Sequence, residues 1–311
     1  MGFILFFIDG IGIGEASYRN PFFKADPEIL RLWHGADLRI GGLSVKPVDP
    51  LLGIPGMPQS ATGQTTIFTG INIPALLNKH HGSFPNRQMR KIIKSDNLLI
   101  KLKDIGVKGR FINAYPMHSE LFSEPNIKIN KDGDLIFSDN FPTIFKRRIS
   151  VTSSIIVSNM VSPFDIEDIK EKRSLYQEYS NESLIKHGLD LPVYSPENAG
   201  EIISGISGNY DFILYEYFQT DVFAHRKLPE EKFELIKNLD RLIGRLISTL
   251  NKRTDTLMII SDHGNMEDAS TKNHTRNYVP LILWGKGREE LSREINSISD
   301  ITPSILNYFK F

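Results

Sequence analysis

Short apolar runs alternate with amphipathic segments along most of the chain, and this alternation indicates the architecture. Runs rich in Ile, Leu, Val and Phe are typical of buried strands, whereas apolar residues three and four apart are typical of helices that cover a sheet. The pattern predicts an α/β fold with a mostly parallel central sheet flanked by helices on both faces. The expected strands are Phe3–Ile8, Arg110–Ala114, Ser154–Val157, Phe212–Tyr217, Leu257–Ile260 and Leu281–Trp284.

The clearest helical periodicity lies near the C-terminal third of the chain. From Pro229 to Leu250, Leu and Ile recur at helical spacing, with Glu, Lys and Asp on the opposite side. Packing against a core explains that apolar side, so we assign it no function. Further helices are expected at Asn97–Ile105, Pro196–Ile206 and Pro303–Phe309.

The length and composition fit a globular protein with a sizeable core. The chain has 311 residues, of which 40% are hydrophobic and 24% charged. We expect a single α/β domain over residues 1–311. The less regular stretch from about Met117 to Glu178 is interpreted as a small insertion or lid, and a decorated surface region fits it equally well.

Charge and residue usage narrow the expected partners. Lys and Arg together number 37, as do Asp and Glu, so the zero net charge gives no reason to expect nucleic acid or an anionic membrane. There is no cysteine, which excludes disulfides, thiolate metal sites and a cysteine nucleophile. The first apolar run is too short for a signal peptide, and no run reaches the ~20 residues of a membrane span. A cytoplasmic location is therefore expected.

Acidic and imidazole residues follow three of the expected strands, and this is the main chemical signal. In open α/β sheets, ligands gather outside the carboxyl ends of the strands. Together with a serine and two further histidines, these residues give seven oxygen and nitrogen ligands. That set suits two divalent metals with a hydroxyl nucleophile between them, a layout for attacking phosphate esters. The seven candidates are Asp9, Ser60, Asp221, His225, Asp262, His263 and His274.

Each of these motifs also has a purely structural interpretation. Asp9, followed by Gly10, could simply cap a turn. Asp221 and His225 are four residues apart and would share a helical face, yet surface helices produce such pairs by chance. Asp262 with the adjoining histidine is more specific, because a buried sheet edge rarely holds both groups without a role.

Ser60 opens a stretch that can form a short helix ending at Gly70. Backbone amides at a helix N-terminus favour a phosphate, and coordination to a metal would lower the pKa of the serine hydroxyl enough for attack. The alternative is an N-cap serine that only satisfies backbone amides. On composition alone, Thr62 competes as the nucleophile.

The joint order of these motifs resembles the alkaline phosphatase superfamily of metalloenzymes. The run from Ser261 to Asp268 is most similar to the branch that contains cofactor-independent phosphoglycerate mutase and phosphopentomutase. The resemblance implies an alkaline phosphatase-like fold and two metal sites, with Ser60 as the residue that becomes phosphorylated. One metal would be held by Asp9, Ser60, Asp262 and His263, and the other by Asp221, His225 and His274.

The expected function is therefore metal-dependent phosphoryl transfer on a small phosphorylated substrate, through a phosphoserine. Hydrolysis of a phosphomonoester or phosphodiester is favoured, because the mutases carry a second domain whose arginines hold the substrate and usually have histidine where this chain has Gln64. A phosphomutase and a non-catalytic metal- or phosphate-binding protein stay open as alternatives. Ligands of this kind suit Mn²⁺ or Zn²⁺, and also Mg²⁺.

Overall fold

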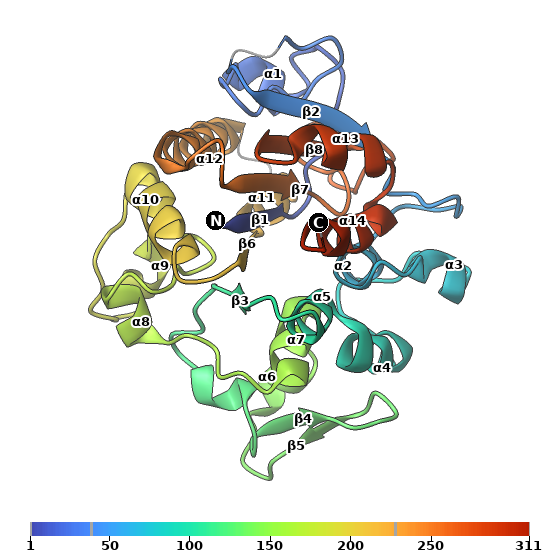
Figure 1. Cartoon of the computed structure of the whole chain (residues 1–311), viewed down its shortest axis with the longest axis vertical. Helices are drawn as coiled ribbons and strands as arrows, with labels where there is room; N and C mark the ends of the chain where they lie inside the picture. The colour runs from blue at the N-terminus through green and yellow to red at the C-terminus, as the bar shows by residue number, and fades with distance from the viewer. Residues whose placement is uncertain (1, 38–39, 227–228, 311) are drawn as a thin grey trace.

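A computed structural model describes residues 2–37, 40–226 and 229–310, and it contains a six-stranded central sheet (Figure 1). Four strands are parallel, and two at one side of the sheet pair antiparallel. The predicted α/β class with a mostly parallel sheet is confirmed. In sheet order the strands are β2 (Leu43–Val48), β8 (Val279–Gly285), β7 (Thr256–Ile260), β1 (Phe3–Ile8), β6 (Phe212–Tyr217) and β3 (Gly109–Phe111).

The central strand β1 is buried on both faces, because alternate side chains enter two different apolar cores. Phe6 packs in the core formed with α10 (Pro196–Ser207) and α12 (Pro229–Thr249). Phe7 packs in the core on the opposite face, which includes α2 (Ser60–Thr69). Figure 1 shows these helix layers on either side of the sheet. Helices on both faces were predicted, and this prediction is confirmed.

Shorter helices complete the two layers and the connections. Among the described residues, no helix is long and apolar enough to cross a bilayer. The remaining helices are α1 (Pro21–Ala25), α3 (Ile73–Leu77), α4 (Arg87–Asp96), α5 (Leu98–Asp104), α6 (Thr143–Lys146), α7 (Val151–Asn159), α8 (Ile166–Lys170), α9 (Glu182–Lys186), α11 (Gln219–Ala224), α13 (Arg288–Glu294) and α14 (Ile301–Tyr308), with 3₁₀ turns at Ser119–Phe122 and Ile298–Asp300.

The expected strand Ser154–Val157 is wrong, because these residues lie in helix α7. The Ser150 side chain caps the start of the helix by accepting a hydrogen bond from the Ser153 amide at 3.0 Å. The hydroxyl of Ser154 donates back to the Ser150 carbonyl at 2.8 Å. Residues 151–157 are buried throughout, so the helix has no polar face whose periodicity could have revealed it.

Two edges of the sheet also differ from expectation. The strand expected at Arg110–Ala114 ends at Phe111, since the chain beyond it turns to bridge Leu175 and Phe164. Strand β2 was not predicted, because Ser44, Lys46 and Pro47 give it a polar composition. It pairs only with β8 at the sheet edge, where a proline is tolerated.

The 117–178 region contains a two-stranded hairpin and helix α7. The hairpin joins β4 (Ile127–Ile129) to β5 (Leu135–Phe137) and lies at the end of the molecule opposite α1 (Figure 1). Ile127 and Ile155 from this region belong to the core on the α2 side of the sheet. The region is therefore packed on the domain, and its role as an insertion or lid stays a prediction.

Asp240 of α12 fastens the N-terminal segment to the helix layer. Its buried carboxylate accepts hydrogen bonds from the backbone amides of Glu28, Ile29 and Leu30, each at 2.9 Å. Burial raises the pKa of this carboxyl, whereas the three amides favour its charged form. One side chain thus accepts hydrogen bonds from three backbone donors of the N-terminal segment.

Replacing Asp240 by alanine should lower the free energy of unfolding by roughly 2–3 kcal/mol, because it leaves buried amides without an acceptor. The measurement is chemical denaturation followed by circular dichroism. Glu234→Ala, at an exposed acidic position on the same helix, is the matched control and should change stability little. Equal losses in both variants would mean that the three hydrogen bonds contribute nothing specific.

Candidate metal centre

Residues from three strand ends meet at one edge of the sheet. Asp9 directly follows β1, Asp221 lies in α11 just after β6, and Asp262 with His263 follows β7. These residues form two groups, and within each group the ligand atoms lie within 4.8 Å of one another. One group is Asp9, Asp262 and His263, and the other is Asp221, His263 and His274. His263 belongs to both sets, so the two groups share an imidazole.

Two glycines make this close approach possible. Gly10 has a φ of +72°, and a Cβ added there would lie 2.8 Å from the Asp221 Oδ1 atom. A Cβ on Gly63 would lie 2.9 Å from the Cβ of Asp262. Contacts this short exclude a side chain without movement of the ligands. The glycine three residues after Ser60 is therefore explained by the packing of α2 against the end of β7.

The carboxylates of Asp9 and Asp262 are buried beside each other, which disfavours two negative charges. Burial raises the pKa of Asp9 well above its usual value, and the charges of Asp262 and Asp221 raise it further. Burial, followed by the charge of Asp221, raises the pKa of Asp262 to about 7. Among the described residues, no lysine or arginine pairs with these carboxylates. A bound cation would supply the missing positive charge.

Gln64 orients both buried carboxylates toward the centre. Its side-chain amide lies 3.0 Å from Asp9 Oδ2 and 3.3 Å from Asp262 Oδ2. The other oxygen of Asp9, Oδ1, is buried and accepts no hydrogen bond within the described part of the chain. A buried anionic oxygen without a donor fits a metal ligand, because coordination would satisfy it. From the sequence, Gln64 was noted only because the mutases usually have histidine at this position, and this contact with the carboxylates was not predicted.

His225 and His274 turn their Nε2 atoms toward the Asp221 carboxylate. His225 Nδ1 lies 2.7 Å from the Lys272 carbonyl, and His274 Nδ1 lies 2.8 Å from the Pro58 carbonyl. A carbonyl only accepts, so these Nδ1 atoms carry the protons and each Nε2 keeps its lone pair. Metal-binding histidines are commonly held in this way. Burial also lowers the pKa of His263 and of His274, which keeps both rings in the neutral form that binds metals.

His225 stands slightly apart from the two close groups. Its Nε2 atom lies 3.4 Å from Asp221 Oδ2, and its ring centroid is 5.6 Å from that of His274. The Asn265 side-chain amide joins it to the centre, at 2.8 Å from Asp221 Oδ1 and 3.2 Å from His225 Nε2. The structure therefore brings His225 next to the expected ligand set, with Asn265 between them. Sequence reasoning gave Asn265 no role.

Ser60 occupies the first turn of α2 with its hydroxyl toward the centre. The Oγ atom lies 3.0 Å from His263 Nε2. The N-cap of α2 is Gln59, so Ser60 is not the N-cap serine of the structural alternative. Thr62 is fully buried, and its hydroxyl donates to the Gln59 carbonyl at 3.0 Å. Of the two hydroxyls, only that of Ser60 reaches the candidate ligands.

The loop that carries Asp262, His263 and His274 is organised by a buried carboxylate that the sequence did not reveal. Glu267 accepts hydrogen bonds from the Gly12 amide at 2.9 Å and the Asn265 amide at 2.8 Å. It also accepts from the side chains of Thr275 and Asn277. These partners come from three separate stretches, so Glu267 ties the ligand loop to the end of β1. Only its place within the recognised motif could have indicated it.

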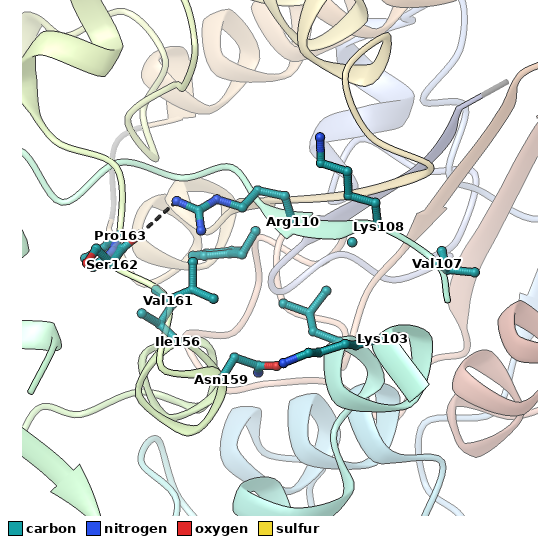
Figure 2. A pocket seen from close by; sticks show the side chains of 12 residues that line it. Lys103, Val107, Lys108, Arg110, Ile156, Asn159, Val161, Ser162 and Pro163 are labelled. Atoms are coloured by element: carbon teal, nitrogen blue, oxygen red, sulfur yellow. Dashed lines mark hydrogen bonds between the residues drawn. The ribbon is translucent and has the colours of Figure 1, made fainter. Parts of the chain in front are cut away.

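A separate cavity of about 240 Å³ lies at the outer edge of β3, away from the candidate ligands (Figure 2). Two of its basic residues have backbone partners: Arg110 donates to the Ser162 carbonyl at 2.8 Å, and Lys108 donates to the Asn209 carbonyl at 3.0 Å. The cavity contains neither a carboxylate nor a histidine. It offers no chemistry that competes with the metal centre.

Asn265→Ala should weaken metal binding by roughly 10–100-fold, the usual effect of removing a group that orients a ligand. The expected cause is loss of the amide that holds Asp221 and His225 together. Competition with a fluorescent chelator measures the affinity. Asn273→Ala, at an exposed position on the same loop, should bind metal as the native protein does. An unchanged affinity in Asn265→Ala would show that the amide does not support the site.

Comparisons with known proteins show similarity of sequence and of fold. Part of the chain is similar to a 2,3-bisphosphoglycerate-independent phosphoglycerate mutase of Francisella tularensis, with 32% identity over 129 residues. That match covers 39% of this chain and only 25% of the mutase.

Two solved alkaline phosphatases share the fold. The enzyme of the Antarctic bacterium TAB5 aligns with a TM-score of 0.55 and 12% identity over 99% of this chain and 98% of its own. The cold-active enzyme of a psychrophilic Shewanella gives a TM-score of 0.55 and 10% identity, over 99% of each chain. The alkaline phosphatase-like fold predicted from the motifs is confirmed. A model of the metalloenzyme superfamily matches residues 1–311, and the chain belongs to this superfamily.

Proposed function

We propose that this protein transfers phosphoryl groups with the help of two divalent metals, and that it hydrolyses a phosphomonoester or phosphodiester through a phosphoserine on Ser60. The observation that carries the proposal is the position of the Ser60 hydroxyl, 3.0 Å from the imidazole shared by two groups of candidate ligands. A nucleophile between two ligand groups is the arrangement that a two-metal phosphoryl transfer requires.

The proposed ligand sets follow the side chains that converge. Asp9, Ser60, Asp262 and His263 would hold one cation, while Asp221, His225 and His274 would hold the other. Two divalent cations at these positions would lower the pKa of the serine hydroxyl and neutralise charge on the phosphoryl group. Mn²⁺, Zn²⁺ and Mg²⁺ all accept this set of oxygen and nitrogen ligands.

The reaction then proceeds in two displacements at phosphorus. The Ser60 hydroxyl gives up its proton to solvent, and its oxygen forms a bond to phosphorus while the bond to the ester oxygen breaks. The leaving alkoxide takes up a proton from solvent. A water molecule next attacks the phosphoserine, which releases phosphate, or a phosphomonoester from a diester substrate, and restores the serine. Gln64 and Asn265 keep the carboxylates and His225 oriented during both steps.

A phosphomutase is the second candidate, and the local similarity to a phosphoglycerate mutase favours it. The two activities differ only in the group that accepts the phosphoryl from Ser60. Water accepts it in a hydrolase, whereas a hydroxyl of the substrate accepts it in a mutase. Isolating the native phosphoenzyme and offering it water or a sugar phosphate would separate the two: discharge by water alone indicates a hydrolase, and discharge only with the sugar phosphate indicates a mutase.

Ser60→Ala should reduce turnover of an aryl phosphate by a factor on the order of 10³ or more, because it removes the nucleophile. The fold and most of the metal binding should survive, since Ser60 supplies one ligand of one metal. Thr62→Val, which removes the neighbouring hydroxyl, should have a much smaller effect. If only the Thr62 variant loses activity, Thr62 is the nucleophile. If neither does, a metal-bound water attacks directly.

Purified protein loaded with metal should contain close to two divalent ions per chain, as measured by inductively coupled plasma mass spectrometry. Chelation should abolish turnover and lower the melting temperature, because metal that binds only the folded state stabilises it. Adding Mn²⁺ or Zn²⁺ back should restore both. One ion or none after metal-replete purification would count heavily against the two-metal assignment.

A further inference from the structure

A cavity beside the candidate metal centre is lined by basic side chains and by no acidic ones. It has a volume of about 380 Å³ and lies between α1, α11, the start of α12 and the loop at residues 269–272. Tyr18, Pro21 and Phe233 form apolar parts of its wall. We call it the cationic cavity, defined by Lys24, Arg226, Lys232 and Lys272.

The positive charges of the cationic cavity are not neutralised by the protein. Within the described ranges, none of its four basic side chains forms an ion pair. Lys24 lies over the Phe233 ring at 4.5 Å, which leaves its ammonium without an anion. The carboxylate of Asp268, close by in the chain, accepts hydrogen bonds from the amide and hydroxyl of Ser270. The positive potential of the cavity would attract an anion from solution.

Lys232 makes the cavity more than a patch of surface charge. Only 5% of this residue is exposed, and its ammonium donates to the Ala224 carbonyl at 3.0 Å. An ammonium has three donor hydrogens, so this bond leaves donor capacity toward the cavity that the residue lines. A buried lysine without an anionic partner is costly, and an anionic ligand would compensate for that cost.

The cationic cavity adjoins the metal centre through shared residues. Ala224 and Arg226, which line the cavity, flank His225 in the chain. Lys272 lines the cavity, and its carbonyl lies 2.7 Å from His225 Nδ1. The cavity is therefore adjacent to the candidate ligand His225.

We propose that the cationic cavity binds a second anionic group of the substrate, and that the preferred substrate is a small phosphate ester with a carboxylate or another phosphate at its far end. This inference rests on the proposed function, since the metal centre must hold the first phosphoryl group. The cavity then acts as a specificity site: it raises affinity for doubly anionic substrates without taking part in bond breaking.

The test measures binding of non-hydrolysable phosphonates to the metal-loaded protein by calorimetry. One series carries a terminal carboxylate two to six carbons from the phosphonate, a second carries a terminal phosphonate, and the reference series carries a methyl group. Carboxylate or bisphosphonate compounds of one preferred length should bind roughly tenfold more tightly than their methyl counterparts, the effect expected of one charged hydrogen bond. The advantage should shrink as salt is raised.

Lys24→Gln should remove much of that advantage and leave affinity for the methyl series unchanged. Lys232 is left intact because it also supports the end of α11, and Lys272 because its carbonyl holds His225. Lys237→Gln, at an exposed position of α12 outside the cavity, is the matched control. The inference is overturned if the native protein shows no advantage at any length, or if the full advantage persists in Lys24→Gln.

The binding experiment does not depend on turnover, so the two proposals can fail separately. If the protein prefers the doubly anionic compounds but never cleaves an aryl phosphate, the proposed function is refuted and the anion-binding role of the cavity stands. If the protein cleaves the aryl phosphate but shows no such preference, only the anion-binding role of the cavity is refuted. For an active enzyme, Lys24→Gln should raise the KM of a carboxylated aryl phosphate several-fold, with kcat and the KM of phenyl phosphate unchanged.

Discussion

The burial of several carboxylates at one edge of the sheet is the constraint on which the rest of the structure depends. Asp9, Asp262 and Glu216 are all nearly inaccessible to solvent. Burial raises the pKa of Glu216 to about 7, and the charge of this residue adds to the rise at Asp9. Amides from Gln64 and hydroxyls such as that of Thr152 compensate only part of this charge. Cations bound at this site would neutralise the rest of the charge and so stabilise the folded state.

The sequence predicted the central strands and the side chains at their ends for the same physical reason. Strand β1 is buried on both faces, so it forms an unbroken apolar run that ends where the chain reaches the edge of the sheet. The first polar residue after such a run must lie at that edge. Asp9 could be placed at the carboxyl end of the sheet on this basis, before any coordinates were known.

The remaining parts could not be predicted because they depend on contacts between distant segments. Helix α7 is buried throughout, so residues 154–157 have the composition of a strand, and only the cap at Ser150 distinguishes them. The role of Glu267 rests on its bond to the Gly12 amide, 255 positions earlier. The sharing of His263 between two groups is likewise a matter of distances, which spacing along the chain does not supply.

The loop between β7 and β8 couples the metal centre to its surroundings. Its backbone fixes His225 through the Lys272 carbonyl, and its Glu267 carboxylate fixes the segment after β1. In the same loop, Lys272 lines the cationic cavity. Because the match to the mutase covers only a quarter of that enzyme, substrate recognition has to be argued from residues of this chain. A loop that holds both a candidate ligand and a cavity wall would let an anion bound in the cavity restrain His225, so that substrate binding and metal geometry are set by one segment.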